Sequence, residues 1–139
     1  MRGLSILLAC AALLAAGCAH RAERPERVRR VGMVTGVKPE KIQEYVDLHA
    51  NAWPGVLDAM LECNIRNFSI YLGEIEPGKH LLFAYYEYWG DDFDGDMAKL
   101  ETYPINDKWW ALTDACQQAV PMHRGAGPWM TMEEVFHSD

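Results

Sequence analysis

The fold is decided by the sequence NFSIYLGEIEPGKHLLFAYYEY, residues 67–88. Apolar residues alternate with less apolar ones over 67–73, which is the period of a β-strand. A Glu-Pro-Gly-Lys turn at 76–79 then leads into a second apolar run at 80–88. Two such runs joined by a short turn predict an antiparallel hairpin.

The second run of this hairpin is apolar on both of its faces. Its side chains divide by parity into Leu81, Phe83 and Tyr85 on one face and Leu82, Ala84 and Tyr86 on the other. Two helices can cover only one face of a four-stranded sheet, so the second face needs another layer. We expect a homodimer that packs sheet against sheet, and the alternative is a monomer that keeps this face open as a ligand cleft.

The flanking sequence extends the hairpin to a complete fold. Upstream, the pattern predicts a strand at 31–37 and a helix from Glu40 that is broken at Pro54, because proline lacks the amide hydrogen of a helical residue. Downstream it predicts helical segments and a final strand, at 95–103, 107–120 and 131–137. The order is β-α-β-β-α-β, which predicts an α+β, ferredoxin-like subunit with a four-stranded antiparallel sheet and helices on one face.

Composition and charge restrict the domain organisation and the partners. The chain has 139 residues and a net charge of −7, and all fifteen aromatic residues lie between Tyr45 and Phe136. Residues 31–139 hold seven basic and eighteen acidic side chains, so we expect one domain there and no nucleic acid partner.

The first thirty residues have a different character. Residues 1–17 combine Arg2 with an apolar run too short to span a bilayer comfortably, and they end in Leu-Ala-Ala-Gly before Cys18, which resembles the lipobox of bacterial lipoproteins. We therefore expect a signal peptide at 1–17, acylation of Cys18, and a basic tether over 18–30. This predicts a lipid-anchored protein of the cell envelope, in the outer membrane or on the periplasmic face, whose only contact with the membrane is the anchor.

The candidate chemistry begins with a histidine on the first predicted helix. Tyr45 and His49 are four residues apart, so they share a face of the helix that is otherwise apolar. A lone histidine there is commonly a hydrogen-bonded core residue. The nearby tyrosine hydroxyl and the helix break at Pro54 add polar groups in apolar surroundings, which is typical of a small-ligand pocket.

A tryptophan pair forms the second candidate feature. Trp109 and Trp110 point about 100° apart on a helix, so one can lie in the core while the other faces a ligand. Flat indole rings with an N–H donor suit the C–H faces and hydroxyls of sugars.

These residues fall into five blocks that resemble the L-rhamnose mutarotase family over residues 30–137. The blocks are Glu44-Tyr45-x-x-x-His49-x-x-x-Trp53-Pro54, the run at 67–72, the run at 81–84, Trp109-Trp110, and Glu134-Val135-Phe136. The resemblance implies a dimeric α/β barrel that interconverts the α and β anomers of L-rhamnose without a metal or an organic cofactor.

The resemblance also implies roles for individual residues. His49 would be the acid/base residue, protonating the ring oxygen, and the acceptor of the anomeric proton stays open between water, a carboxylate and another group. Tyr45, Phe68, Trp109 and Trp110 would contact a monosaccharide. Position 68 departs from the family, which commonly has tyrosine there, so a hydrogen bond worth roughly 0.5 to 1.5 kcal/mol is lost and the sugar can differ.

Two other functional classes share this architecture. One is a sugar-binding lipoprotein without turnover, and the other is a different dimeric α/β-barrel activity such as a small monooxygenase. The spacing of Cys63 and Cys116 leaves both a disulfide and two buried thiols open.

Overall fold

The computed structural model describes residues 23–138, so the predicted signal peptide and Cys18 lie outside the described residues. The predicted β-α-β-β-α-β order is confirmed. Each of the two helical regions consists of two consecutive α-helices. The elements are β1 (Arg29–Val37), a 3-10 turn (Pro39–Lys41), α1 (Ile42–Ala50), α2 (Pro54–Glu62), β2 (Ile65–Glu76), β3 (Lys79–Tyr88), α3 (Phe93–Glu101), α4 (Pro104–Cys116), β4 (Gln117–Gln118) and β5 (Met130–Met132).

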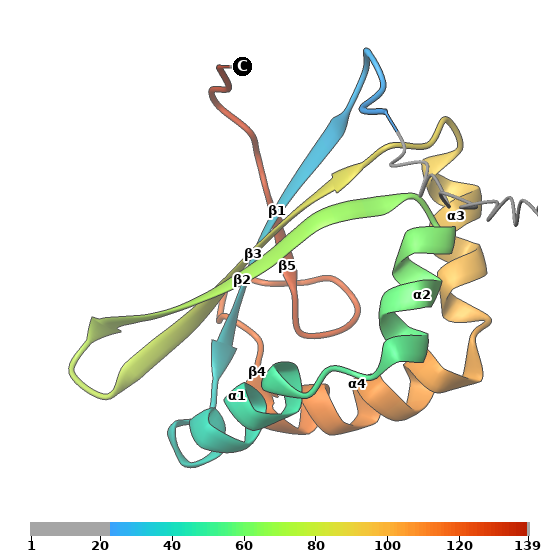
Figure 1. Cartoon of the computed structure of the whole chain (residues 1–139). Coiled ribbons are helices and arrows are strands. Elements are labelled where there is room, and N and C mark those ends of the chain that lie inside the picture. The colour runs from blue at the N-terminus through green and yellow to red at the C-terminus, as the bar shows by residue number, and fades with distance from the viewer. Residues whose placement is uncertain (1–22, 139) are drawn as a thin grey trace, which may run out of the picture.

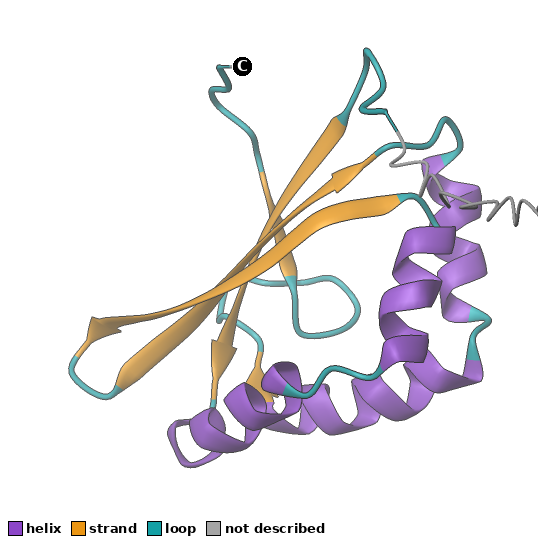
Figure 2. Ribbon diagram, in the orientation of Figure 1, coloured by secondary structure: helices purple, strands orange, loops and turns teal. Residues whose placement is uncertain are grey.

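The strands form one antiparallel sheet in the order β2-β3-β1-β4, and β5 also pairs with β1. β1 and β3 are therefore the central strands, as in a ferredoxin-like fold. The α-helices lie on one side of the twisted sheet, as Figure 1 and Figure 2 show. The predicted α+β class and the helices on one face are confirmed.

The predicted hairpin is formed by β2 and β3. Gly78 has a φ of 76°, a conformation that glycine adopts without steric cost, and its N–H donates to the Glu74 carboxylate over 2.8 Å. The register between the strands shifts between Arg66 and Ser69, which marks an irregularity in β2 around Phe68.

The first helical run breaks where the sequence predicts. α1 ends at Ala50 and α2 begins at Pro54, and Trp53 between them is extended, with φ −69° and ψ 130°. Proline disfavours helical geometry in the residue before it, and it fits the first position of a new helix because no donor is needed there. The chain therefore changes direction at Trp53.

α4 ends earlier than the sequence pattern predicts. It stops at Cys116 instead of continuing to residue 120, because Gln117 and Gln118 pair with the end of β1. A Cβ atom at Gly36 would lie 2.5 Å from the Gln118 carbonyl oxygen, so this close approach requires glycine.

The last strand is shorter than predicted. β5 covers Met130–Met132 and not 131–137, and Val135 and Phe136 beyond it are exposed. The Arg30 guanidinium contacts the Glu134 carboxylate over 2.9 Å, so a side-chain ion pair and not a strand ladder ties this segment to β1.

The core between sheet and helices has two clusters. One lies against α2 and α3 and contains Val31, Ile65, Tyr86 and Tyr88. The other lies against α1 and the end of α4 and contains Val37, Tyr45, Leu82 and Cys116. The second cluster brings Tyr45 into contact with the sheet. Cys63 and Cys116 are both buried and free, which decides between the two alternatives for these thiols.

The opposite face of the sheet carries apolar side chains in a row across three strands. Tyr71 pairs with Phe83, and Phe83 pairs with Val34, so the three side chains share one face. Tyr71 is 64% exposed. The odd residues of β3 are therefore on the face away from the helices, and the even residues face the helices.

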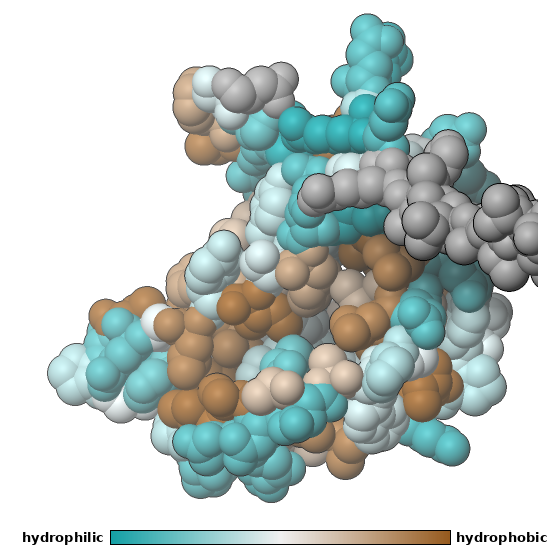
Figure 3. All heavy atoms as spheres, in the orientation of Figure 1, coloured by the Kyte–Doolittle hydropathy of each residue, from teal (hydrophilic) through white to brown (hydrophobic). Residues whose placement is uncertain are grey.

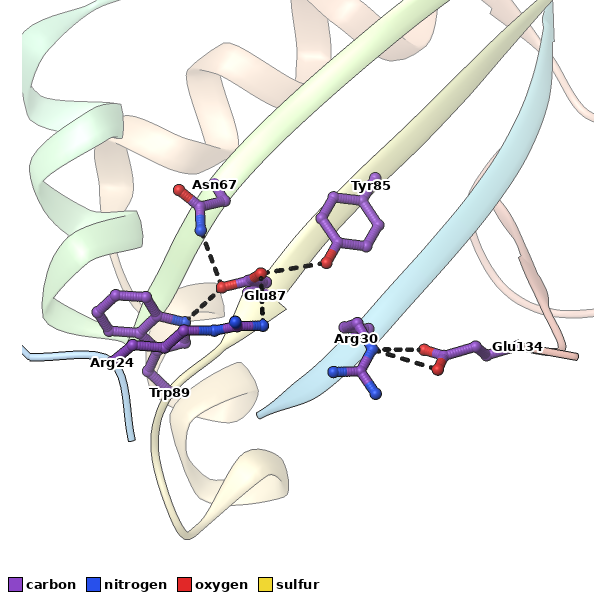
Figure 4. A network of polar contacts seen from close by, with 7 residues as sticks. All are labelled: Arg24, Arg30, Asn67, Tyr85, Glu87, Trp89 and Glu134. Carbon is purple, nitrogen blue, oxygen red and sulfur yellow. Dashed lines mark hydrogen bonds and ion pairs between the residues drawn. The ribbon is translucent and has the colours of Figure 1, made fainter. Parts of the chain in front are cut away.

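Glu87 is a buried carboxylate on the same face of β3 as Phe83 and Tyr85. Glu87 is 7% exposed and accepts hydrogen bonds from Asn67, Trp89, Tyr85 and Arg24, at 2.8, 2.7, 3.3 and 3.4 Å (Figure 4). Burial acts to raise the pKa of Glu87, but the hydrogen bonds from Trp89 and Asn67 and the Arg24 charge outweigh it and lower the pKa. The carboxylate thus joins β2, β3 and the segment that precedes β1.

No helix within residues 23–138 is long and apolar enough to cross a membrane.

We predict that Glu87→Gln lowers the free energy of unfolding by about 1 to 3 kcal/mol near neutral pH, because an amide cannot accept all these hydrogen bonds. Because the folded-state pKa lies below the ordinary value, this contribution is present above that value and lost as pH falls through the folded-state pKa. Urea unfolding of both proteins at several pH values measures the difference. The exposed Glu101→Gln on α3 serves as control, and equal losses for the two variants would contradict the prediction.

Candidate active site

The candidate site begins with two neighbouring rings on α1, tilted against each other. The Tyr45 and His49 ring centroids lie 4.2 Å apart with an interplanar angle of 30°. This follows from their spacing, since residues four apart on a helix are neighbours. Tyr45 is buried, whereas His49 is only half-buried, so the imidazole is not sealed in the core.

Two tryptophans complete this ring cluster. The Trp109 ring, from α4, lies 5.2 Å from the His49 ring and 5.4 Å from the Trp53 ring, with near-perpendicular planes in both pairs. Trp53 is part of the segment that breaks the helix, and sequence reasoning did not assign it to the site. Its position immediately before Pro54 is the signal that could have identified it, because that residue must leave the helix axis.

The hydrogen bond of His49 fixes its tautomer. Nδ1 lies 2.9 Å from the Tyr45 carbonyl oxygen, which can only accept, so Nδ1 carries the hydrogen and donates it. Burial lowers the pKa of His49, although the hydrogen bond to Tyr45 acts in the opposite direction. The imidazole is therefore neutral near pH 7, with a lone pair on Nε2 that can accept a proton.

The Tyr45 hydroxyl has a buried partner. Gln117 Nε2 donates to it over 3.3 Å. Burial raises the pKa of Tyr45 to about 12, the Gln117 hydrogen bond opposes this rise, and repulsion from Cys116 and Asp114 adds smaller increases. Tyr45 therefore keeps its proton at neutral pH and can donate a hydrogen bond.

Two predicted site residues lie outside the ring cluster. Trp110 is half-buried next to the fully packed Trp109, so the pair does divide between core and a more open position. Phe68 stacks on Tyr86 instead, with ring centroids 5.8 Å apart and an angle of 16°. Phe68 is 40% exposed, so one side of its ring is open to a ligand.

An open cleft of about 470 Å³ adjoins the ring cluster. Its walls combine apolar side chains with carboxylates and an amide, from Glu44, Asp47, Leu48, Asn51 and Trp53. The space-filling view shows apolar side chains, in brown, beside a hollow between the sheet and the helices (Figure 3). Trp53 is the member of the ring cluster that lines this cleft, and it contacts Trp109; Tyr45, His49 and Trp109 do not line the cleft.

The arrangement is suited to moving a proton on a small polar molecule. A neutral imidazole nitrogen accepts, a tyrosine hydroxyl donates, and flat rings supply apolar surface. Within residues 23–138, no group of three or more His, Cys, Asp or Glu side chains is arranged to hold a metal ion.

Comparison with known proteins decides the family. The sequence profile of L-rhamnose mutarotase matches residues 30–138. The chain belongs to the L-rhamnose mutarotase family. It is 35% identical to the L-rhamnose mutarotase of Sinorhizobium fredii over 102 residues, and 31% identical to that of Mesorhizobium japonicum over the same length, covering 73% of this chain and 89% of each relative.

Two further L-rhamnose mutarotases are similar to this chain, one in sequence over its whole length and one in three-dimensional structure. The L-rhamnose mutarotase of Oceanobacillus iheyensis is 28% identical, over 81% of this chain and 100% of its own. The crystal structure of an L-rhamnose mutarotase from Formosa agariphila superposes with a TM-score of 0.61 at 22% identity, covering 80% of this chain and 99% of that one. This last comparison establishes the common fold.

Proposed function

We propose that the protein interconverts the α and β anomers of L-rhamnose or a related sugar by acid/base-catalysed ring opening. Membership of the L-rhamnose mutarotase family supports this activity. The observation that carries the mechanism is the fixed tautomer of His49, which leaves Nε2 as a proton acceptor beside the Tyr45 and Trp109 rings.

In this proposal the neutral imidazole begins the reaction as a base and then protonates the ring oxygen, which is the step that the family resemblance implies for His49. His49 Nε2 takes the proton of the anomeric hydroxyl, the C1–O5 bond breaks, and its electron pair goes to O5 as the C1–O1 carbonyl forms. The imidazolium then returns the proton to O5. Rotation about C1–C2 and the reverse steps on the other carbonyl face give the opposite anomer, so protons and electrons balance with one residue.

The surrounding residues supply binding and orientation in this proposal. The half-buried Trp110 offers apolar surface to the C–H faces of the sugar, Trp109 packs against His49 from the core, and Tyr45 donates a hydrogen bond. Phe68 offers a ring face without a hydroxyl, which supports a sugar that needs no hydrogen bond at that point.

We predict that His49→Ala lowers the catalysed rate of anomer exchange of L-rhamnose by about 100-fold or more. In the wild type, activity is constant near neutrality and falls as pH drops through a pKa below 6.5, because only neutral His49 accepts a proton. Saturation-transfer NMR of the anomeric protons measures the rate, with the uncatalysed exchange subtracted. His123→Ala, in the loop before β5, is the matched control.

A sugar panel separates this function from binding alone. L-Rhamnose, L-fucose and L-lyxose would each be tested for binding and for exchange. Binding without accelerated exchange, or an unchanged rate for His49→Ala, would contradict the proposed mechanism.

We propose further that the protein is a homodimer in which the face away from the helices is the interface. Tyr71, which is 64% exposed, and the half-buried Phe83 support this, since exposed apolar side chains on a sheet favour burial against a second copy. Val34, in the same row, is already buried within the subunit.

For this interface we predict that Tyr71→Glu converts the dimer to a monomer, because two introduced charges would face each other without water. Analytical ultracentrifugation measures the mass of the full-length protein in mild detergent. Leu61→Glu on α2, 51% exposed before substitution, should leave the dimer intact. A monomeric wild type would contradict the proposal.

We also propose that Cys18 is acylated and that residues 18–30 tether the domain to the cell envelope. The lipobox-like sequence before Cys18 supports this. Arg24 contacts Glu87 over 3.4 Å, so the tether as proposed includes residues that touch the domain.

For the anchor we predict that Cys18→Ser moves the protein from the membrane fraction to the soluble fraction, because the acyl chains supply the membrane affinity. Mass spectrometry of the wild type should show a mature chain that begins at Cys18 and carries diacylglycerol. Equal fractionation of both proteins would contradict lipid anchoring.

A further inference from the structure

Gln117 occupies the point where the helical layer joins the sheet. Its backbone N–H donates to the Asp114 carbonyl at the end of α4, and it pairs with Val37 across β1 and β4. Val37 packs against Tyr45 in the core, and side chains of paired residues share a face, so the Gln117 amide lies on the helical side of the sheet. The residue is 5% exposed.

The amide of Gln117 is only half satisfied. Nε2 donates to the Tyr45 hydroxyl, while Oε1 is buried and has no hydrogen-bond partner among the described residues. A tyrosine hydroxyl that accepts from Gln117 still has its own proton to donate. Within residues 23–138, no acceptor for that proton accompanies the Gln117 contact.

We propose that Gln117 is a positioning residue that makes Tyr45 a hydrogen-bond donor to the sugar. This inference rests on the proposed mutarotase function. By occupying a lone pair of the phenol oxygen, the Gln117 N–H directs the Tyr45 O–H away from itself and toward the substrate. The Tyr45 hydroxyl then donates beside His49 Nε2, which accepts, so the two neighbouring side chains offer a donor and an acceptor to one sugar.

The cost of this arrangement supports a functional role. A buried carbonyl without a partner destabilises the folded protein, and an apolar side chain of similar size would avoid that cost. Gln117 nevertheless presents a polar amide whose side-chain hydrogen bond, among residues 23–138, goes to Tyr45 of the candidate site. Groups that lower stability at such positions are typical of functional sites.

Three variants of full-length protein in mild detergent test the proposal. Gln117→Met keeps the shape and removes the donor, and we expect kcat/KM for L-rhamnose to fall roughly three- to tenfold, as for one lost hydrogen bond. We expect its melting temperature to stay equal or rise, because the unpaired carbonyl is gone. Gln117→Glu, assayed at pH 8, presents an ionised carboxylate that accepts the hydrogen bond of the Tyr45 hydroxyl. This variant should lower kcat/KM at least as much as Gln117→Met.

The third variant places Gln117→Met in a Tyr45→Phe background. If Gln117 acts through the hydroxyl, the additional substitution should leave kcat/KM of the Tyr45→Phe enzyme unchanged. A further loss there would assign Gln117 a role independent of Tyr45 and would overturn the proposal.

Two other outcomes would also overturn it. Wild-type activity of Gln117→Glu would mean that Gln117 acts as an acceptor, with its amide in the opposite orientation. A parallel loss of melting temperature and activity in Gln117→Met would indicate a purely structural residue. Gln118→Met and Gln118→Glu, at the exposed neighbouring position, are matched controls that should retain activity.

The same assays keep this inference distinct from the function on which it rests. A wild type that does not accelerate anomer exchange refutes the proposed function. A wild type that does, together with active Gln117 variants, refutes only the role of Gln117.

Discussion

The candidate site depends on the break in the helical run at Trp53 and Pro54. A continuous helix over this region would carry Trp53 along the axis of α1, whereas the extended conformation at Trp53 turns the chain. The turn lets α1 run beside α4, so that His49 and Trp53 both contact Trp109. It also frees α2 to pack Val56 and Ala59 under the sheet as a separate helix. One proline thus separates α1, which carries Tyr45 and His49 of the candidate site, from α2, which packs Val56 and Ala59 into the core.

Much of this fold could be predicted because its main signals are local. The turn at 76–79, the alternation in β2 and the proline at position 54 each act within a few residues of themselves. The end of α4 and the extent of β5 could not be predicted in this way. Gln117 leaves the helix because it pairs with β1, about eighty residues earlier in the chain. The spacing of apolar residues around position 117 does not indicate that pairing.

In the candidate site too, contacts set by local spacing could be predicted and contacts set by tertiary packing could not. Tyr45 and His49 meet because of helical spacing, which is visible in the sequence. Their contact with Trp109 depends on how two helices pack, and only the family resemblance suggested it. Gln117 was missed because its approach to Tyr45 requires the closure of β4 on β1. Phe68 faces the helices, but its ring partner Tyr86 comes from the neighbouring strand and could not be inferred from either run alone.

Burial has two effects on the ring cluster that work together. It lowers the pKa of His49, which keeps Nε2 free to accept, and it raises the pKa of Tyr45 to about 12, which keeps the phenol able to donate. The Tyr45 backbone carbonyl fixes the imidazole tautomer, so one residue orients the His49 ring through its main chain and offers a hydrogen-bond donor through its side chain. An acceptor and a hydrogen-bond donor side by side suit a small molecule with several hydroxyls, and a single helical turn provides both.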